Sequence, residues 1–325
     1  MYTILCTGDS HAWGQGAAGL WEEFAPPPQP GEPRCASFAP PSYVNLLRNA
    51  VCELTGSAAA ELQAPELCER FGLMPAADGF AETQTPFTFD TAAELLRIQL
   101  RAESRLILTC DGAPLLTCDL TAAPCPVYNL ALRLDGEPHA LRFAPDGGRP
   151  LAFYRIEGYR GAYAVVNTAV GSCTAGRYSE EYWGTHVLPY APDLVLLQAH
   201  TVNDWISGKS AEAYGRELAA LIHRFQCYGA QVVLLTAAPV SGPQRWPESA
   251  AETYNDFVAA SRAAAAQCGV PIADANALIN RRLRGGEALF ADNWHPNNLG
   301  HRLYAISAIN ALRTVLPVLS GAAVR

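Results

Sequence analysis

Five short apolar runs constrain the fold of this chain more than any other feature of its sequence. They span residues 2–6, 163–166, 193–197, 231–236 and 270–273. Most are near-continuous in Val, Ile and Leu rather than alternating with polar residues, which is typical of strands buried on both faces of a parallel sheet. Helical segments separate the later runs. This strand–helix alternation predicts an α/β fold in which helices cover both faces of a five-stranded parallel sheet.

The helical segments show a clear amphipathic period. In 211–228 the apolar residues recur at helical spacing and form one buried face, and Gly229 ends the segment. The residues of that face are Tyr214, Leu218, Leu221, Ile222 and Phe225. Segments 249–268 and 297–315 are predicted as two further helices.

The pattern changes between residues 84 and 160. Here short apolar runs alternate with period two, and turn signals such as Asp111-Gly112 and Asp135-Gly136 separate them. We therefore expect an antiparallel β-sandwich inserted into the α/β fold. The predicted division assigns 1–83 and 161–325 to the α/β domain and 84–160 to the insertion. The insertion is expected to resemble a carbohydrate-binding module.

Composition limits the class of protein. Half of the residues are hydrophobic, 17% are charged and the formal net charge is −8. Such a chain can bury a large core, and Lys and Arg form no run, so neither nucleic acid nor a membrane surface is an expected partner. The first residues lack a basic segment before an apolar one, and no uncharged apolar stretch reaches membrane-spanning length.

The ten cysteines contain no Cys-x-x-Cys pair, because the closest two are seven residues apart. A structural zinc ribbon is therefore not expected, and the cysteines are interpreted as small apolar residues with free thiols. Free thiols and the missing leader together predict a cytoplasmic protein. The Gly- and Pro-rich stretch 14–42 is predicted as a long functional loop.

Polar residues follow three of the predicted strands. Gly8-Asp9-Ser10 follows the first, Gly171 follows the second, and Asn203-Asp204 follows the third. A fourth group, Asp292-Asn-Trp-His295, comes after the last strand and before the final helix. Since ligands bind beyond the carboxyl ends of parallel strands, we expect these four groups to meet in one crevice.

The residue types suit acyl transfer. A serine hydroxyl becomes an effective nucleophile beside a base, which assigns Ser10 and His295 to those roles. Asp292 lies three residues before His295 and would orient the imidazole. The backbone N–H groups of Ser10 and Gly171 and the amide of Asn203 would donate hydrogen bonds to the developing oxyanion.

In these four groups the chain resembles the SGNH/GDSL hydrolase family. The family carries a Gly-Asp-Ser block, a Gly block, a Gly-x-Asn-Asp block and an Asp-x-x-His block in this order. The resemblance covers about 1–60 and 160–315 and implies a flavodoxin-like three-layer sandwich. It also implies hydrolysis of carboxylic esters, often acetyl groups on sugars, with no metal or cofactor. Two residues depart from the family pattern: His11 stands where Leu is commoner, and Thr201 replaces the first Gly of the third block.

Other residues near these blocks are candidates for the substrate pocket. They are Asp9, His200, Asp204, Trp205 and Trp294. Tryptophan can stack on a sugar ring, but it is at least as often a core residue. Likewise Asn203-Asp204 could cap a helix, Gly171 could serve only as a turn, and His301 could be a packing residue. A metal site at Asp292, His295 and His301 lacks a fourth ligand and is not favoured.

The sequence therefore predicts a serine esterase that acts on a carbohydrate or small-molecule ester. Two alternatives remain open at this stage: a non-catalytic carbohydrate-binding protein and an acyltransferase that uses the same three residues. The oligomeric state also stays open, and a homo-oligomer is compatible with everything above.

Overall fold

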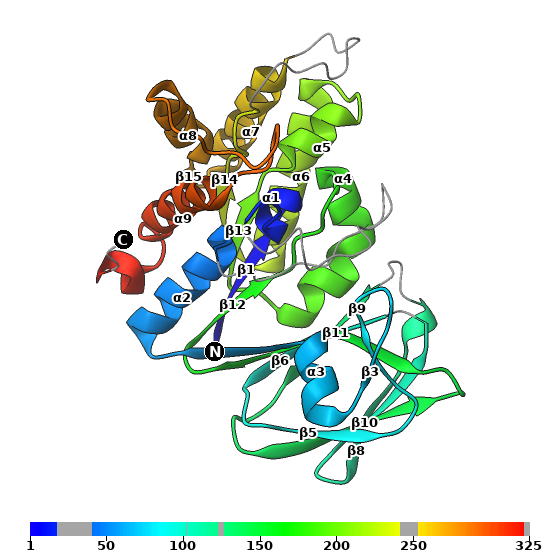
Figure 1. Ribbon diagram of the computed structural model, residues 1–325. Coiled ribbons are helices and arrows are strands. Elements are labelled where there is room, and N and C mark those ends of the chain that lie inside the picture. Colours follow the sequence, from blue (N-terminus) through cyan, green and yellow to red (C-terminus); the bar gives the residue numbers. More distant parts are fainter. Residues whose placement is uncertain (18–40, 102, 123–126, 241–252, 322–325) are drawn as a thin grey trace.

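The computed structural model describes residues 1–17, 41–101, 103–122, 127–240 and 253–321 (Figure 1). Its centre is a five-stranded parallel sheet with strand order β12-β1-β13-β14-β15. The strands are β1 (Tyr2–Thr7), β12 (Tyr163–Asn167), β13 (Leu194–Gln198), β14 (Gln231–Leu235) and β15 (Ile272–Ala273). Each lies on a predicted apolar run, and counted in chain order the arrangement is 2-1-3-4-5, that of flavodoxin-like sheets. The five-stranded parallel sheet is thus confirmed.

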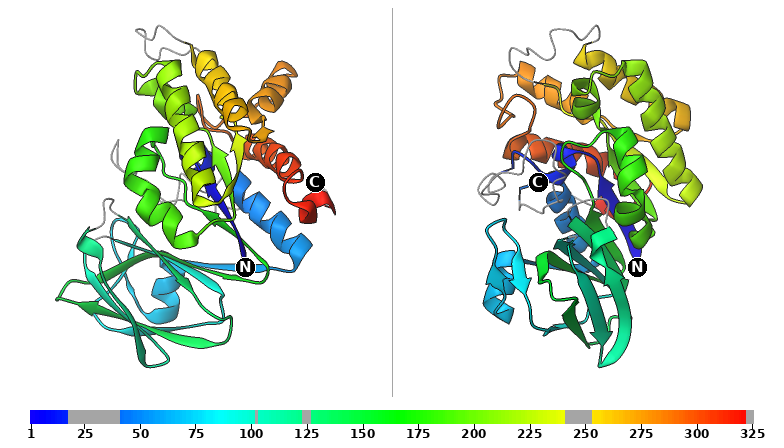
Figure 2. Two further views of the ribbon diagram at one scale, coloured as in Figure 1. Left: turned by 180° about the vertical axis from the view of Figure 1, so that it is seen from behind. Right: turned by 90° about the vertical axis from the view of Figure 1, so that its right-hand side faces the viewer.

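Helices cover both faces of this sheet, as expected for a sheet whose strands are apolar throughout (Figures 1 and 2). Within β1, Leu5 belongs to one buried cluster while Ile4 and Cys6 belong to the other. On the Leu5 face lie α4 (Ala175–Arg177), the π-helical segment η2 (Tyr178–Val187), α5 (Thr201–Ile206), α6 (Ala211–Tyr228) and α7 (Tyr254–Cys268). On the opposite face lie α1 (Ser10–Trp13), α2 (Tyr43–Thr55), α8 (Ala275–Arg284) and α9 (Asn298–Leu312).

The predicted helix 211–228 is observed as α6 with the same bounds. Ser210 caps its first turn by accepting a hydrogen bond from the Ala213 N–H, and Gly229 ends it with a positive φ of 100°. The other two predicted helices, 249–268 and 297–315, are observed as α7 and α9. Of these segments, 249–252 lies outside the described residues, as do residues 18–40 of the predicted loop.

Two antiparallel sheets lie between α2 and β12 in the sequence. One has the strand order β5-β10-β7-β8, and the other has β3-β4-β11-β6-β9 with β2 also paired to β11. Their inward side chains share one apolar cluster, in which Phe143 and Phe153 contact each other edge to face. The strands are β2 (Ala58–Gln63), β3 (Met74–Pro75), β4 (Ala81–Thr83), β5 (Phe87–Thr91), β6 (Leu95–Arg101), β7 (Arg105–Cys110), β8 (Ala113–Asp119), β9 (Val127–Arg133), β10 (His139–Asp146) and β11 (Leu151–Arg160).

The antiparallel pairing begins earlier than the predicted boundary at residue 84. Strand β2 pairs with β11 from Ala58, and helix α3 (Ala64–Phe71) follows it. The sequence of β2, Ala-Ala-Ala-Glu-Leu-Gln, contains no β-branched or aromatic residue, so it carries little strand propensity of its own. Its pairing is decided by the long neighbouring strand β11, which the local pattern does not reveal.

The antiparallel sheets lie at the amino-terminal end of the parallel strands (Figure 1). The Arg133 guanidinium there donates hydrogen bonds to Thr3 Oγ1 and to the carbonyl of Tyr190. A buried polar network continues this interface: Arg97 pairs with Glu157 at 3.2 Å and donates to Asn129 Oδ1. Since Ser10 follows the carboxyl end of β1, the antiparallel sheets and Ser10 lie at opposite ends of the parallel sheet.

The eight described cysteines are all free, and Cys6 and Cys173 are fully buried, as expected of small apolar residues. Burial raises the pKa of both thiols. Cys227, by contrast, is exposed. Within the described residues, no helix combines the length and apolar character needed to cross a membrane.

Five histidines are buried in the fold, and burial that lowers the pKa of a histidine makes stability depend on pH. The pKa values of His11, His186 and His301 are each lowered to about 3 by burial. In an unfolded chain a histidine titrates near about 6.5. Between these two values the unfolded chain binds more protons than the folded one, so the free energy of unfolding falls as the pH falls. The expected slope approaches about 1.4 kcal/mol per pH unit for each histidine.

Urea denaturation between pH 7.5 and 5 measures this slope. His186→Gln should make the slope shallower by one histidine's share, because a glutamine oxygen can still accept the hydrogen bond from the Asn129 amide. His223→Gln on the exposed face of α6 is the matched control and should leave the slope unchanged. A slope that is the same in all three proteins would contradict the assignment.

Candidate functional site

The site begins where β1 turns into α1. Gly8 has a positive φ of 149°, and a Cβ built on it would lie 2.5 Å from Gln198 Oε1 at the end of β13. The same oxygen accepts a hydrogen bond from the Asp9 N–H at 2.9 Å. Glycine at position 8 therefore lets the ends of β1 and β13 approach closely enough to be joined by this bond.

Asp9 shapes the short helix α1. Its carboxylate caps the helix by accepting the N–H of His11 at 3.0 Å, and Ser10 is the first residue of the helix. Burial raises the pKa of Asp9, and this shift is opposed by His200, by the N–H of His11 and by the amide of Asn203. Asp9 therefore acts as a buried N-cap of the helix that begins at Ser10.

The hydroxyl of Ser10 lies within hydrogen-bonding reach of the imidazole of His295, 285 residues away. The Ser10 Oγ to His295 Nε2 distance is 3.0 Å, and His295 Nδ1 lies 2.7 Å from Asp292 Oδ2. Ser10 is 7% exposed and His295 is 8% exposed, so both side chains are shielded without being sealed from a reactant. The structure therefore brings together the hydroxyl, base and carboxylate that the sequence predicted to meet.

Asp292 holds the imidazole through a short turn. Its Oδ1 accepts the N–H groups of Trp294 at 2.9 Å and His295 at 2.7 Å, while Oδ2 faces the ring. Burial favours the neutral acid, but the hydrogen bond from the His295 ring, its charge and the two N–H groups lower the pKa of Asp292 to about 2. The carboxylate is consequently ionised at neutral pH and fixes the proton of His295 on Nδ1, leaving Nε2 to accept from Ser10.

His11 connects this turn to the rest of the site. Its Nε2 lies 2.9 Å from the carbonyl oxygen of Trp294, which can only accept, so Nε2 carries the proton. Its Nδ1 then accepts the hydroxyl of Tyr304 at 3.2 Å, and Tyr304 in turn accepts the N–H of Ala238. The ring also meets His295 edge to face at 5.7 Å between centroids. His11 therefore ties the turn that carries His295 to the helix that carries Ser10.

The second and third predicted blocks lie beside the first. The Val170 N–H donates to the carbonyl of Gly8 at 3.1 Å, which places the Gly171 segment alongside the β1–α1 turn. His200 Nδ1 donates to the carbonyl of Cys173 at 2.9 Å. Asp204 Oδ2 accepts the N–H of Ala175 at 2.9 Å. The polar residues around α5 thereby hold the segment that follows Gly171.

Two of the candidate pocket residues are buried and contact other residues of the protein. Asp204 is fully buried, and its second oxygen accepts Lys209 at 2.8 Å. Burial raises the pKa of Asp204 to about 6, against the opposing effects of Lys209 and the Ala175 N–H. Trp205 is also buried and meets Tyr254 edge to face. Both side chains therefore contact protein groups that surround the site.

Three buried polar atoms near Ser10 make no hydrogen bond within the described part of the chain. They are Asn203 Nδ2, His200 Nε2 and Asp9 Oδ2. An unsatisfied buried donor is costly, typically about 1–3 kcal/mol, so such atoms mark places where a ligand or water completes the bonding. Asn203 Nδ2 is the donor among the three, and it is the group predicted to bind the oxyanion.

The remaining candidate residues, Trp294 and His301, pack against other parts of the protein. Trp294 is partly buried against the cluster that contains Leu5. His301 accepts the N–H of Tyr43 and donates to the carbonyl of Gln15, so both of its nitrogens are used in packing.

Sequence reasoning missed two supporting residues, Gln198 and Tyr304. Gln198 could have been found, because it is the polar residue that ends the apolar run of β13. Tyr304 gives no such signal, since it is one of several apolar or aromatic residues on α9 and its hydroxyl reaches His11 only through the fold.

Comparison with known proteins gives a family match. The model of the GDSL-like Lipase/Acylhydrolase family matches residues 136–303, which is more than half of the chain. The match includes Gly171, Asn203 and His295, whereas Ser10 lies before it. No curated protein matches the chain.

Solved structures are similar to this chain at low sequence identity. A structure titled "Peptidoglycan O-acetylesterase in action, 5 min" is 15% identical with a TM-score of 0.55, covering 98% of this chain and 92% of that one. The protein YXIM from Bacillus subtilis is 14% identical with a TM-score of 0.43, over 79% and 88% of the two chains. An acetylxylan esterase, Axe2, from Geobacillus stearothermophilus is 18% identical with a TM-score of 0.39, over 50% and 74%.

Replacing His11 tests its role in positioning the imidazole. His11→Leu removes the bonds to Trp294 and Tyr304, so the 292–295 turn should shift relative to Ser10. Because a misplacement of about 1 Å can slow a reaction about 100-fold, we expect a fluorophosphonate to label Ser10 about 10–100-fold more slowly. Tyr304→Phe keeps the His11–Trp294 bond and should show a smaller decrease. Labelling of His11→Leu at the unaltered rate would show that this bond does not position the base.

Proposed function

Because the chain belongs to the GDSL-like lipase/acylhydrolase family and is a carboxylic ester hydrolase, we propose that Ser10 is its nucleophile, with His295 as general base and Asp292 as its orienting carboxylate. The observation that carries this proposal is the pair of contacts at 3.0 Å and 2.7 Å that joins the three side chains. It is also the reason to prefer an enzyme over a non-catalytic binding protein, since binding alone requires no such link.

In the first half of the reaction, Ser10 Oγ attacks the ester carbonyl carbon and its proton passes to His295 Nε2. The tetrahedral intermediate then collapses, the bond to the alcohol oxygen breaks, and Nε2 returns the proton to the departing alcohol. The acyl group remains on Ser10. Asp292, ionised because its pKa is about 2, stabilises the imidazolium that forms between these steps.

In the second half, His295 takes a proton from a water molecule as its oxygen attacks the acyl carbon. Collapse of this second intermediate breaks the bond to Ser10, and the proton on Nε2 passes to Oγ. The carboxylic acid leaves and the free enzyme is restored. An acyltransferase would differ only here, with an alcohol in place of water.

The oxyanion in both halves is proposed to lie against the N–H groups of Ser10 and Gly171 and the amide of Asn203. The buried Nδ2 of Asn203 supports this assignment, because the intermediate would supply a closer acceptor than the Asp9 carboxylate, which this amide faces in the folded chain. Hydrogen bonds from His200 and to Asp204 hold the neighbouring segment in place, so Gly171 is presented from a supported backbone.

For the substrate we propose short acyl groups, acetyl above all, on a carbohydrate or a small molecule. The structure that shares this fold over nearly the whole chain is titled a peptidoglycan O-acetylesterase, which supports an acetylated sugar. Residues 58–160 are proposed as an inserted module rather than as a wall of the pocket, because they lie at the opposite end of the parallel sheet from Ser10. The free cysteines fit a reducing compartment such as the cytoplasm.

The direct test is covalent labelling followed by mutation. A fluorophosphonate should modify Ser10, and Ser10→Ala should abolish both labelling and hydrolysis of 4-nitrophenyl acetate while leaving the far-ultraviolet circular dichroism unchanged. Hydrolysis that survives in Ser10→Ala would remove Ser10 from the mechanism.

Asn203→Ala tests the oxyanion donor. Loss of one such donor typically lowers kcat about 10²–10³-fold, with little change in KM because the bond strengthens only in the transition state. Asn280→Ala on α8, whose amide donates to Asn276, is the matched control and should keep full activity. A decrease in kcat of less than about threefold in Asn203→Ala would leave the oxyanion to other donors.

A further inference from the structure

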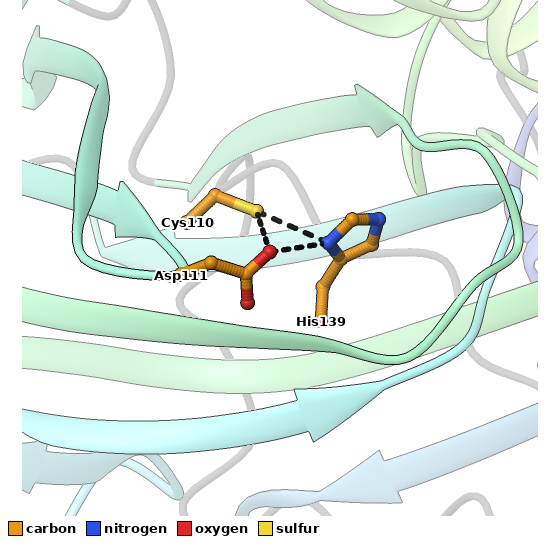
Figure 3. Close-up of side chains that lie close together, drawn as sticks. All are labelled: Cys110, Asp111 and His139. Atoms are coloured by element: carbon orange, nitrogen blue, oxygen red, sulfur yellow. Dashed lines mark hydrogen bonds and ion pairs between the residues drawn. The ribbon is translucent and has the colours of Figure 1, made fainter.

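A second group of chemically reactive side chains lies in the antiparallel region. Cys110 ends β7, Asp111 begins the turn from β7 to β8, and His139 begins β10 (Figure 3). Cys110 Sγ lies 3.6 Å from Asp111 Oδ2 and 3.5 Å from His139 Nδ1, and these last two atoms are 2.7 Å apart. A thiol, a carboxylate and an imidazole thus point at one place from two separate turns.

We propose that this cluster is a Zn²⁺ site. Zinc prefers tetrahedral sulfur, nitrogen and oxygen ligands at about 2.3 Å for sulfur and about 2.0–2.2 Å for nitrogen and oxygen. Ligands at those distances are about 3.5–3.6 Å apart along the edges that include sulfur and about 3.3 Å apart along the nitrogen–oxygen edge. Both observed sulfur distances match. The observed nitrogen–oxygen distance of 2.7 Å is about 0.6 Å shorter than the tetrahedral edge. It is the length of a hydrogen bond, which the metal would replace.

The residues around the cluster hold two of the ligands in the required orientation. Asp135 Oδ1 lies 2.7 Å from His139 Nε2, on the far side of the ring from the proposed metal. Carboxylate–histidine–zinc arrangements of this kind fix the ring and strengthen its basicity. Asp111 Oδ1 accepts the Ala140 N–H at 2.8 Å, which leaves Oδ2 to face the site. The protein therefore supplies three ligands and leaves a fourth position for water.

The competing explanation is a plain ion pair, in which a protonated His139 donates to both carboxylates. Hydrogen bonds to Asp111 and Asp135 do raise the pKa of His139. A plain ion pair needs only the ring and the two acids, whereas here Cys110 Sγ also donates to Asp111 Oδ2 at 3.6 Å and lies 3.5 Å from Nδ1. The cluster therefore offers a sulfur ligand that the ion pair does not require. Binding of the metal would release the Cys110 and Nδ1 protons, so affinity should rise with pH.

The site escapes a search of the sequence because Cys110 and His139 are 29 residues apart and form no short motif. The β7–β10 pairing, with Leu141 opposite Cys110, brings them together. The metal would join the β7–β8 turn to the β9–β10 connection at the edge of the sheet. It lies in the region that faces away from Ser10, so its role is to stabilise the fold rather than to take part in ester hydrolysis.

Titration of the metal-free chain with ZnCl₂, followed by calorimetry, tests the proposal. One equivalent should bind, and Cys110→Ala and His139→Ala should abolish that binding. Asp135→Asn should weaken it about 10–100-fold, the usual effect of losing a carboxylate behind a ligating histidine. With Co²⁺ instead of Zn²⁺, thiolate-to-metal charge-transfer absorption should appear in the natural chain and be absent from Cys110→Ala.

Cys227→Ala is the matched control, because Cys227 Sγ also lies close to a histidine, at 3.4 Å from His223 Nε2. Zinc binding in that variant should equal that of the natural chain. Retained esterase activity shows that each variant is folded. Undiminished zinc binding by Cys110→Ala and His139→Ala would overturn the proposal, as would absence of binding in the natural chain. Loss of esterase activity on addition of one equivalent of zinc would place the ion at His295 instead. That result would also overturn the proposal.

Discussion

The hydrogen bond between Ser10 and His295 is the contact on which the rest of this structure depends. It joins a turn near the start of the chain to a turn near its end, and it forms only if both turns are held within a few tenths of an ångström. A parallel sheet provides this precision, because all strand ends that carry polar residues lie at one edge. The joined ends of β1 and β13, the cap on α1 and the His11–Trp294 bond each remove one way in which the two groups could separate.

Much of this arrangement could be predicted from the sequence, and the reasons are physical. The strands of the parallel sheet are apolar on both faces, so their positions show in composition alone, and the blocks that follow them must then meet. The antiparallel sheets were harder to predict. Strand β6 contains Arg97 and Gln99 on the face that meets the α/β part, and both are buried there by partners from distant strands. Local hydrophobicity does not reveal a strand with buried polar residues. Strand β2 is also missed, because it contains few residues of high strand propensity.

The supporting residues of the site show the same limit. Asp204 looked like a wall of the pocket because it follows Asn203, but its carboxylate bonds Ala175 and Lys209 instead. Whether a polar residue faces a substrate or the protein is decided by what the fold places opposite it, and no single segment contains that information. The meeting of Ser10, Asp292 and His295 was predictable because their residue types and order match strand ends at one edge of the sheet, whereas the scaffolding around them follows from three-dimensional packing.

The separation of Ser10 and His295 along the chain has a consequence for synthesis. A ribosome delivers the Ser10 turn before the antiparallel sheets, and the His295 turn after them. Since segments that emerge early begin to fold before later ones exist, the scaffold can assemble around a serine that still has no base. On the mechanism proposed above, the growing polypeptide cannot hydrolyse esters until the 292–295 turn has been translated and has folded against Ser10.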